Sequence, residues 1–214
     1  MQQRMQGTRF TLLTVISTFT WFALIAQFYL IIINRNASVP ETIIRYFSYF
    51  TILTNILVAC CSTILARQRN TRLYTFVARQ TTLAAVAVYI VIVGVTYNII
   101  LRSIWDPQGL QLVVDELLHS IVPILFLIYW LKFTPKQELH WKNAFHWTAF
   151  PGVYSVYIFL RGSISGFYPY PFINVNQLGF MHAVFNAGII AMVIVITSFL
   201  FITLGKALEK MSTD

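Results

Sequence analysis

Long apolar stretches separated by short polar connections dominate the pattern of this 214-residue chain. A helix needs roughly 20 mostly apolar residues to cross the hydrocarbon core of a bilayer. Six stretches approach that length, at residues 10–33, 45–66, 80–101, 112–133, 144–160 and 179–205. The fifth is the weakest, because Pro151 and Gly152 interrupt it. The alternation of apolar and polar residues that a membrane barrel needs is absent, so the pattern predicts helices.

The composition agrees with this pattern. Hydrophobic residues make up 57% of the chain and charged residues 10%, with a mean hydropathy of +0.69. Such values exclude an ordinary soluble domain. The connections are too short to hold a second domain. We therefore predict an all-α polytopic membrane protein, a single bundle of six transmembrane helices over residues 1–214.

The formal net charge of +8 is unevenly distributed. If six spans alternate, eleven of the fifteen basic residues fall on the side of the termini, which predicts cytoplasmic N- and C-termini. These eleven are Arg4, Arg9, Arg67, Arg69, Arg72, Arg79, Lys132, Lys136, Lys142, Lys206 and Lys210. Aromatic interleaving and a folded basic face are missing, so membrane lipids rather than nucleic acid are the expected partners. A bacterial inner membrane and a eukaryotic endomembrane or plasma membrane both fit.

Ionisable residues inside one predicted span are the first functional signal. The segment "DELLHSIVP", residues 115–123, places two carboxylates and an imidazole within five positions. Asp115 and Glu116 lie four and three residues before His119, so all three share one side of a helix. Ionisable groups are costly inside a membrane and usually mark a functional site in the bundle interior.

Helical rise predicts that these residues meet others at the same depth. With the N-terminus inside, Thr51 lies six residues past Arg45 and His119 seven past Leu112. At 1.5 Å per residue, both are about 10 Å below the outer ends of their spans. Asn55 follows Thr51 on the same stripe of its helix.

The last span adds a polar pair to the same outer layer. His182 and Asn186 stand four residues apart near its start, so they share one helix face. We expect one polar pocket in the outer half of the bundle, with Asn55, Glu116, His182 and Asn186 binding substrate or supporting the site. Interhelical hydrogen bonding is the simpler role for the two asparagines.

A histidine beside a carboxylate supplies the base and the orienting group of a nucleophilic triad. The hydroxyls at the matching depth include Thr51 and Thr54. Threonine is inert at neutral pH unless a base accepts its proton. The spacing therefore predicts Thr51 as nucleophile, His119 as base and Asp115 as orienting group, acting on a lipid ester.

Three segments resemble the androgen-induced family of integral-membrane threonine hydrolases, which includes the androgen-dependent regulators of tissue factor pathway inhibitor. They are "YFSYFTILTNILVA" (46–59), "DELLHSIVP" (115–123) and "GFYPYPF" (166–172). The resemblance puts Thr51 at the family's catalytic threonine, His119 at its histidine and Tyr170 in its YPF motif. It implies hydrolysis of fatty acid esters of hydroxy fatty acids, without metal or other cofactor. Asp115 stands where family members have asparagine, and Pro123 is one residue closer to the histidine.

The "YPYPF" segment has two interpretations. Pro169 and Pro171 stiffen it, and its aromatic rings fit a belt at the level of the lipid headgroups. Alternatively, the segment covers the pocket, and Tyr170 donates a hydrogen bond to an ester oxygen.

Two other functions remain open at this stage. One is a metal-dependent intramembrane hydrolase with Asp115, His119 and His182 as ligands. The other is a non-enzymatic carrier, either proton-coupled or with haem between His119 and His182.

Overall fold

A computed structural model describes residues 2–69 and 71–213, so positions 1, 70 and 214 of the predicted single domain lie outside the described residues. The described part is 82% helix and contains no strand. The longer helices are α1 (Gln2–Ile33), α2 (Val39–Phe47), α3 (Phe50–Arg67), α5 (Gln80–Thr96), α6 (Leu110–Glu116), α7 (Val122–Phe133), α9 (Ala149–Ser165) and α11 (Phe180–Thr213). The shorter ones are α4 (Arg72–Val77), η1 (Tyr97–Leu101), η2 (Leu117–Ile121), α8 (Asn143–His146), η3 (Pro171–Ile173) and α10 (Val175–Leu178).

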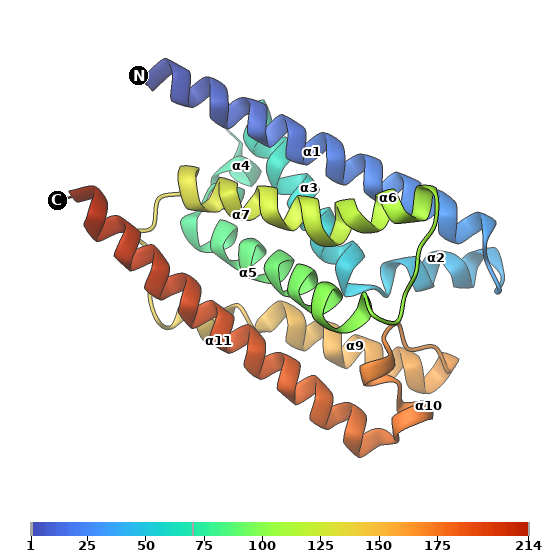
Figure 1. Ribbon diagram of the computed structural model, residues 1–214. Helices are drawn as coiled ribbons and strands as arrows, with labels where there is room; N and C mark the ends of the chain where they lie inside the picture. The colour runs from blue at the N-terminus through green and yellow to red at the C-terminus, as the bar shows by residue number, and fades with distance from the viewer. Residues whose placement is uncertain (1, 70, 214) are drawn as a thin grey trace.

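Among the described residues, five helical segments are long and apolar enough to cross a bilayer. They are Gln3–Ile33, Phe50–Arg67, Gln80–Leu101, Leu110–Phe133 and Phe180–Met211. The prediction of a multi-pass helical membrane protein is thus supported at this coarser level. Figure 1 shows the helices side by side in one bundle, with both termini at the same end.

The segment predicted to cross at residues 144–160 is built differently from the expectation. Its first residues form α8 and a turn, and α9 begins only at Ala149. Pro151 falls in the first turn of α9, where a backbone N–H has no partner within the helix. The proline therefore marks the start of a helix instead of interrupting one. With 17 residues, α9 is shorter than the five segments above.

The core is centred on α5. This helix is apolar all round. In its segment, 67% of the residues in the most apolar stretch are buried, the highest share of the five, against 22% in the segment of α11. It packs against α3, α7 and α11, while α1 packs on α3 and α7 from the other side. In Figure 1, α1 and α11 accordingly form the two flanks of the bundle. Apolar residues exposed on the flanks face the lipid in a membrane.

The predicted second span is interrupted near its first residues. Helix α2 stops at Phe47, Tyr49 is extended with φ −82° and ψ 124°, and α3 begins at Phe50. The hydroxyl of Tyr154 in α9 donates to the carbonyl of Ser48 at 2.9 Å, which satisfies a backbone group at the break. Thr51 therefore lies in the first turn of a helix rather than six residues inside a continuous one.

Candidate functional site

Two cavities meet inside the bundle. The larger, of about 730 Å³, lies at the end away from the termini and is lined by residues of α1, α2, α3, η1, α6 and η2, by the loop 102–109 and by the segment 169–171. We call it the polar cavity, because glutamine, asparagine, aspartate and histidine side chains line it. The smaller, of about 250 Å³, lies among α5, α9 and α11 and is lined almost entirely by apolar groups. We call it the apolar cavity.

Four residues line both cavities and form their junction: Thr51, Tyr97, Leu101 and Tyr170. Thr54, the other threonine considered from the sequence, lines neither, and its buried hydroxyl has no hydrogen-bond partner. The fold therefore distinguishes the two threonines, which the sequence spacing alone did not.

Thr51 is in contact with Tyr170 through two of its atoms. The Thr51 backbone N–H, free because it belongs to the first turn of α3, donates to the Tyr170 hydroxyl at 3.2 Å. The Thr51 hydroxyl lies 3.4 Å from the same oxygen. Burial raises the pKa of Tyr170 to about 12, only partly offset by its hydrogen bonds to Thr51. The phenol therefore stays protonated and can donate at any physiological pH.

Packing of aromatic rings holds Tyr170 in place. Its ring stacks on Phe172 at 5.2 Å and meets the edge of Tyr49 at 5.9 Å. Asn186 of α11 donates to the Phe172 carbonyl at 2.9 Å and ties the segment to that helix. The "YPYPF" segment thus lies over the junction of the cavities, and Asn186 supports it without lining either cavity.

A proline explains the unusual helix around His119. Pro123 has no N–H to give to the His119 carbonyl four residues earlier. The helix opens there into η2, a π-helix in which the Val122 N–H donates to Leu117 instead. Asn98 of η1 takes over, donating to the His119 carbonyl at 3.2 Å.

A glycine allows η2 to approach α5 this closely. A Cβ atom at Gly94 would lie only 3.0 Å from the His119 carbonyl and 3.2 Å from the Pro123 ring. Gly94 itself has ordinary helical backbone, so the requirement is for space rather than for conformation.

The imidazole of His119 has a defined orientation. Its Nδ1 lies 2.9 Å from the backbone carbonyl of Asp115, which can only accept. Nδ1 therefore carries the proton, and Nε2 keeps the lone pair that a general base needs. Tyr97 of η1 stacks on the ring at 3.9 Å, with 9° between the planes. Tyr97 from η1 and His119 from η2 thus form one stacked pair.

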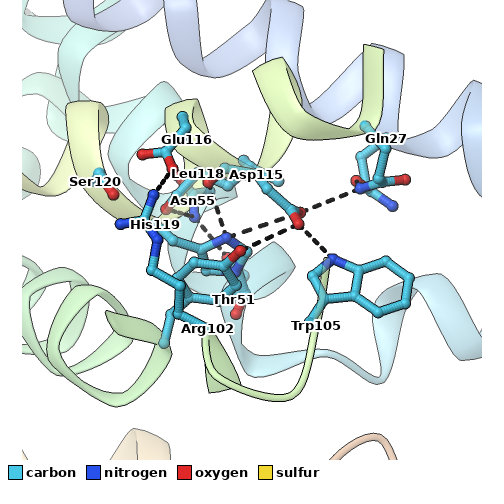
Figure 2. A network of polar contacts seen from close by, with 12 residues as sticks. Gln27, Thr51, Asn55, Arg102, Trp105, Asp115, Glu116, Leu118, His119 and Ser120 are labelled. Atoms are coloured by element: carbon cyan, nitrogen blue, oxygen red, sulfur yellow. Dashed lines mark hydrogen bonds and ion pairs between the residues drawn. The ribbon is translucent and has the colours of Figure 1, made fainter. Parts of the chain in front are cut away.

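The Asp115 carboxylate serves a different set of partners. Its Oδ2 accepts from Trp105 Nε1 at 2.6 Å and from the Tyr97 hydroxyl at 3.3 Å, and its Oδ1 accepts from Gln111 at 3.1 Å. The nearer carboxylate oxygen is 4.0 Å from His119 Nδ1. Asp115 therefore orients the imidazole through its backbone carbonyl, while its side chain fastens the loop 102–109 over the polar cavity (Figure 2). Asp115 is buried, and its three hydrogen-bond donors among the described residues are all neutral.

Thr51 and His119 line the same polar cavity, although no hydrogen bond joins them among the described contacts. Asn55 connects their two helices. Its amide donates to the Thr51 carbonyl at 2.9 Å and to the Leu118 carbonyl at 3.3 Å. Its Oδ1 is buried without a partner. Asn55 is therefore a support for both predicted catalytic residues and does not line a cavity.

Two further predicted site residues, Glu116 and His182, also lie outside the cavities. Glu116 is ion-paired with Arg102, and Figure 2 shows its side chain turned toward that arginine. His182 is exposed on α11 and contacts the Leu178 carbonyl at 3.1 Å. It does not join Asp115 and His119, and the described residues hold no group of three His, Cys, Asp or Glu side chains placed to bind a metal ion.

The sequence interpretation missed three partners of the site: Tyr97, Trp105 and Gln111. Gln111 was within reach, because it precedes Asp115 by four residues on the same helix. Tyr97 and Trp105 come from elements whose positions depend on tertiary packing. Comparison with protein-family models, curated proteins and solved structures gave no match.

Proposed function

We propose that the protein is an integral-membrane hydrolase of lipid carboxylic esters, with Thr51 as nucleophile and His119 as general base. The observation that carries the proposal is the position of Thr51 where the polar and apolar cavities meet, with His119 lining the polar one. A lipid ester has an apolar acyl chain, a polar alcohol and a carbonyl carbon between them. Its two parts match the two cavities, and its carbonyl then lies beside Thr51.

The reaction is an acyl transfer in two steps. The Thr51 hydroxyl attacks the carbonyl carbon while His119 Nε2 takes its proton. The tetrahedral intermediate collapses, the C–O bond to the alcohol breaks, and His119 returns the proton to the leaving alcohol. Water entering through the polar cavity then attacks the acyl-threonine, with His119 again as base, and releases the fatty acid. Ester and water become acid and alcohol, so the atoms balance.

The negative oxygen of the intermediate needs hydrogen-bond donors. The Thr51 backbone N–H and the Tyr170 hydroxyl are next to the proposed reacting atom, and the N–H donates to the hydroxyl oxygen at 3.2 Å. An ester oxygen that enters between them can accept from both. Donors of this kind, fixed before the reaction, commonly contribute the largest single part of catalysis.

In our proposal, the protein has six spans and both termini lie in the cytoplasm. The shared end of the two termini in Figure 1 requires an even number of crossings if all spans traverse the bilayer. Helix α9 supplies the sixth, because its 17 residues extend about 26 Å, close to the thickness of the hydrocarbon core. The polar cavity then opens to the outer leaflet, where lipid esters are accessible laterally.

The test is ester hydrolysis by purified full-length protein in detergent. The substrate is a fatty acid ester of a hydroxy fatty acid, as the family resemblance implies, beside a monoacylglycerol. Thr51→Val removes the hydroxyl while keeping the shape, and we expect it to lower kcat by at least about 10³-fold. His119→Gln should have a similar effect. Thr51→Ser, which keeps a hydroxyl, should restore part of the activity.

Thr54→Val is the matched control on the same helix. It removes a buried hydroxyl that has no partner, so both activity and thermal stability should remain at or above the wild-type level. Full activity of folded Thr51→Val, or loss of activity in Thr54→Val with Thr51 intact, would contradict the assignment of the nucleophile.

A further inference from the structure

The charged side chains that line the polar cavity are both acidic. They are Asp106, in the loop 102–109, and Asp115. The remaining polar lining includes four neutral amides, Gln27, Asn34, Gln108 and Gln111, together with hydroxyl, indole and imidazole groups. Within residues 2–69 and 71–213, no lysine or arginine lines this cavity. A site of this composition offers many neutral donors and acceptors but no cation.

Three of the four arginines predicted on the outer side have carboxylate partners, and the fourth, Arg35, donates to the Ile32 carbonyl at 3.0 Å. Arg45 is ion-paired with Glu41 at 2.8 Å, and its guanidinium lies 4.5 Å from the centre of the Phe167 ring. Arg102 is ion-paired with Glu116 and also donates to Asn98. Arg161 shares Glu41 with Arg45, and none of these arginines lines the polar cavity.

These facts bear on the alcohol released by the proposed reaction. A hydroxy fatty acid carries a carboxylate, which would lie near two like charges and without a counter-ion. If the substrate carboxylate lies about 5–10 Å from each aspartate, in the dielectric of a wet cavity, the two repulsions together lower the affinity for the anionic alcohol about tenfold. Hydroxyl groups carry no such penalty, because each can donate to one amide oxygen and accept from another amide N–H.

We infer that the preferred substrates are esters whose alcohol half is neutral and rich in hydroxyl groups, as in monoacylglycerols. This inference rests on the proposed ester hydrolysis at Thr51 and names the alcohol that the polar cavity accepts. It differs from the hydroxy fatty acid that the family resemblance implies. The same two carboxylates would attract a cationic alcohol such as choline, but choline has no hydroxyl left to bond the neutral groups of the lining, and Asp115 already accepts three hydrogen bonds.

Three esters with the same acyl chain test the inference: a monoacylglycerol, a fatty acid ester of a hydroxy fatty acid and an acylcholine. We expect kcat/KM of the full-length protein for the glycerol ester to exceed that for the anionic ester by about tenfold at low salt. High salt should reduce this preference, because it screens the repulsion. Equal or better use of the anionic ester would overturn the inference, as would a preference for the choline ester.

Charge variants test the physical cause. Asp106→Asn removes one acidic group from the rim of the cavity and should lower the preference for the glycerol ester about twofold to threefold. Glu138→Gln changes the net charge by the same amount in an exposed loop outside both cavities, and it should leave the preference unchanged. An unchanged preference in Asp106→Asn would remove the electrostatic explanation.

The failure of each proposal has its own signature. If Thr51→Val hydrolyses every ester as fast as the wild type, the proposed function fails and the inference fails with it. If hydrolysis depends on Thr51 but favours the hydroxy fatty acid ester, the proposed function stands and only the assignment of the alcohol is overturned.

Discussion

Tyr170→Phe removes one oxygen from the junction of the two cavities and little else. The lost hydroxyl is the one that accepts from the Thr51 N–H at 3.2 Å and lies 3.4 Å from the Thr51 hydroxyl. The ring contacts with Phe172 and Tyr49 do not involve that oxygen, so they persist. The variant therefore separates the chemistry of Tyr170 from its packing.

The expected effects on catalysis and stability differ in size. Loss of one oxyanion donor typically lowers kcat by 10²–10³-fold, so we expect about 10²-fold, equal to about 2.7 kcal/mol of activation free energy. The ground-state hydrogen bond is long and between neutral groups, so its loss costs about 1 kcal/mol of stability. Because the pKa of Tyr170 is about 12, the ratio of wild-type to variant activity should stay constant between about pH 6 and pH 9.

The assay compares kcat of wild type and variants on one monoacylglycerol, with thermal unfolding in the same detergent. Tyr168→Phe is the matched control, because it makes the same deletion in the same loop at a residue that lines neither cavity. It should keep full activity. A folded Tyr170→Phe protein with unchanged kcat would refute the donor role. A higher kcat would show that the Tyr170 hydroxyl only restrains Thr51.

Three further predictions follow from the same geometry. Gly152 lines the apolar cavity, and a Cβ built on it meets no atom within 4 Å. Gly152→Leu therefore fills space that we assign to the acyl chain. It should lower kcat/KM for long-chain relative to short-chain esters about tenfold, because about two CH₂ groups of the long chain can no longer be buried. Gly188→Leu, equally open but outside both cavities, should leave that ratio unchanged. Asp115→Asn should lower kcat less than about tenfold, since a backbone carbonyl holds the imidazole; a loss near 10⁴-fold would show that the carboxylate fixes the tautomer. Hydrogen bonding to Arg45 lowers the pKa of Glu41 from its ordinary value of 4.5. The stabilisation from this ion pair is therefore present above pH 4.5 and is lost as the pH falls through the lowered pKa. The difference in Tm between wild type and Glu41→Gln should accordingly disappear in acid.

Hydropathy alone was sufficient for the helical class and for most of the long helices. The predicted span at 80–101 coincides with α5 and η1, and that at 112–133 differs from its segment by two residues at one end. Such agreement is expected, because a membrane helix must satisfy its own backbone and expose apolar side chains over a fixed length. The signal is local, so one sequence is enough to read it.

The break before α3 was beyond reach for the opposite reason. Nothing in the run from Tyr46 to Thr51 forbids a continuous helix, since it contains neither proline nor glycine. The break is held by the Tyr154 hydroxyl on the Ser48 carbonyl and by Tyr170 on the Thr51 N–H, and both partners are more than a hundred residues away. The predicted equal depth of Thr51 and His119 assumed an unbroken helix, and their common cavity has a different structural cause.

The two π-helices show where a local signal and a tertiary one combine. The sequence alone indicates that the His119 carbonyl loses its helical partner, because Pro123 has no N–H. The group that replaces this partner cannot be predicted from the sequence. Asn98 reaches the carbonyl only because Gly94 lets α5 come close. A π-helical turn also carries one extra residue, which rotates the following side chains by about 100° around the axis. The stacking of Tyr97 on His119 depends on such a turn in each helix, so an insertion or deletion of one residue in either should separate the rings and displace His119 from its position in the polar cavity.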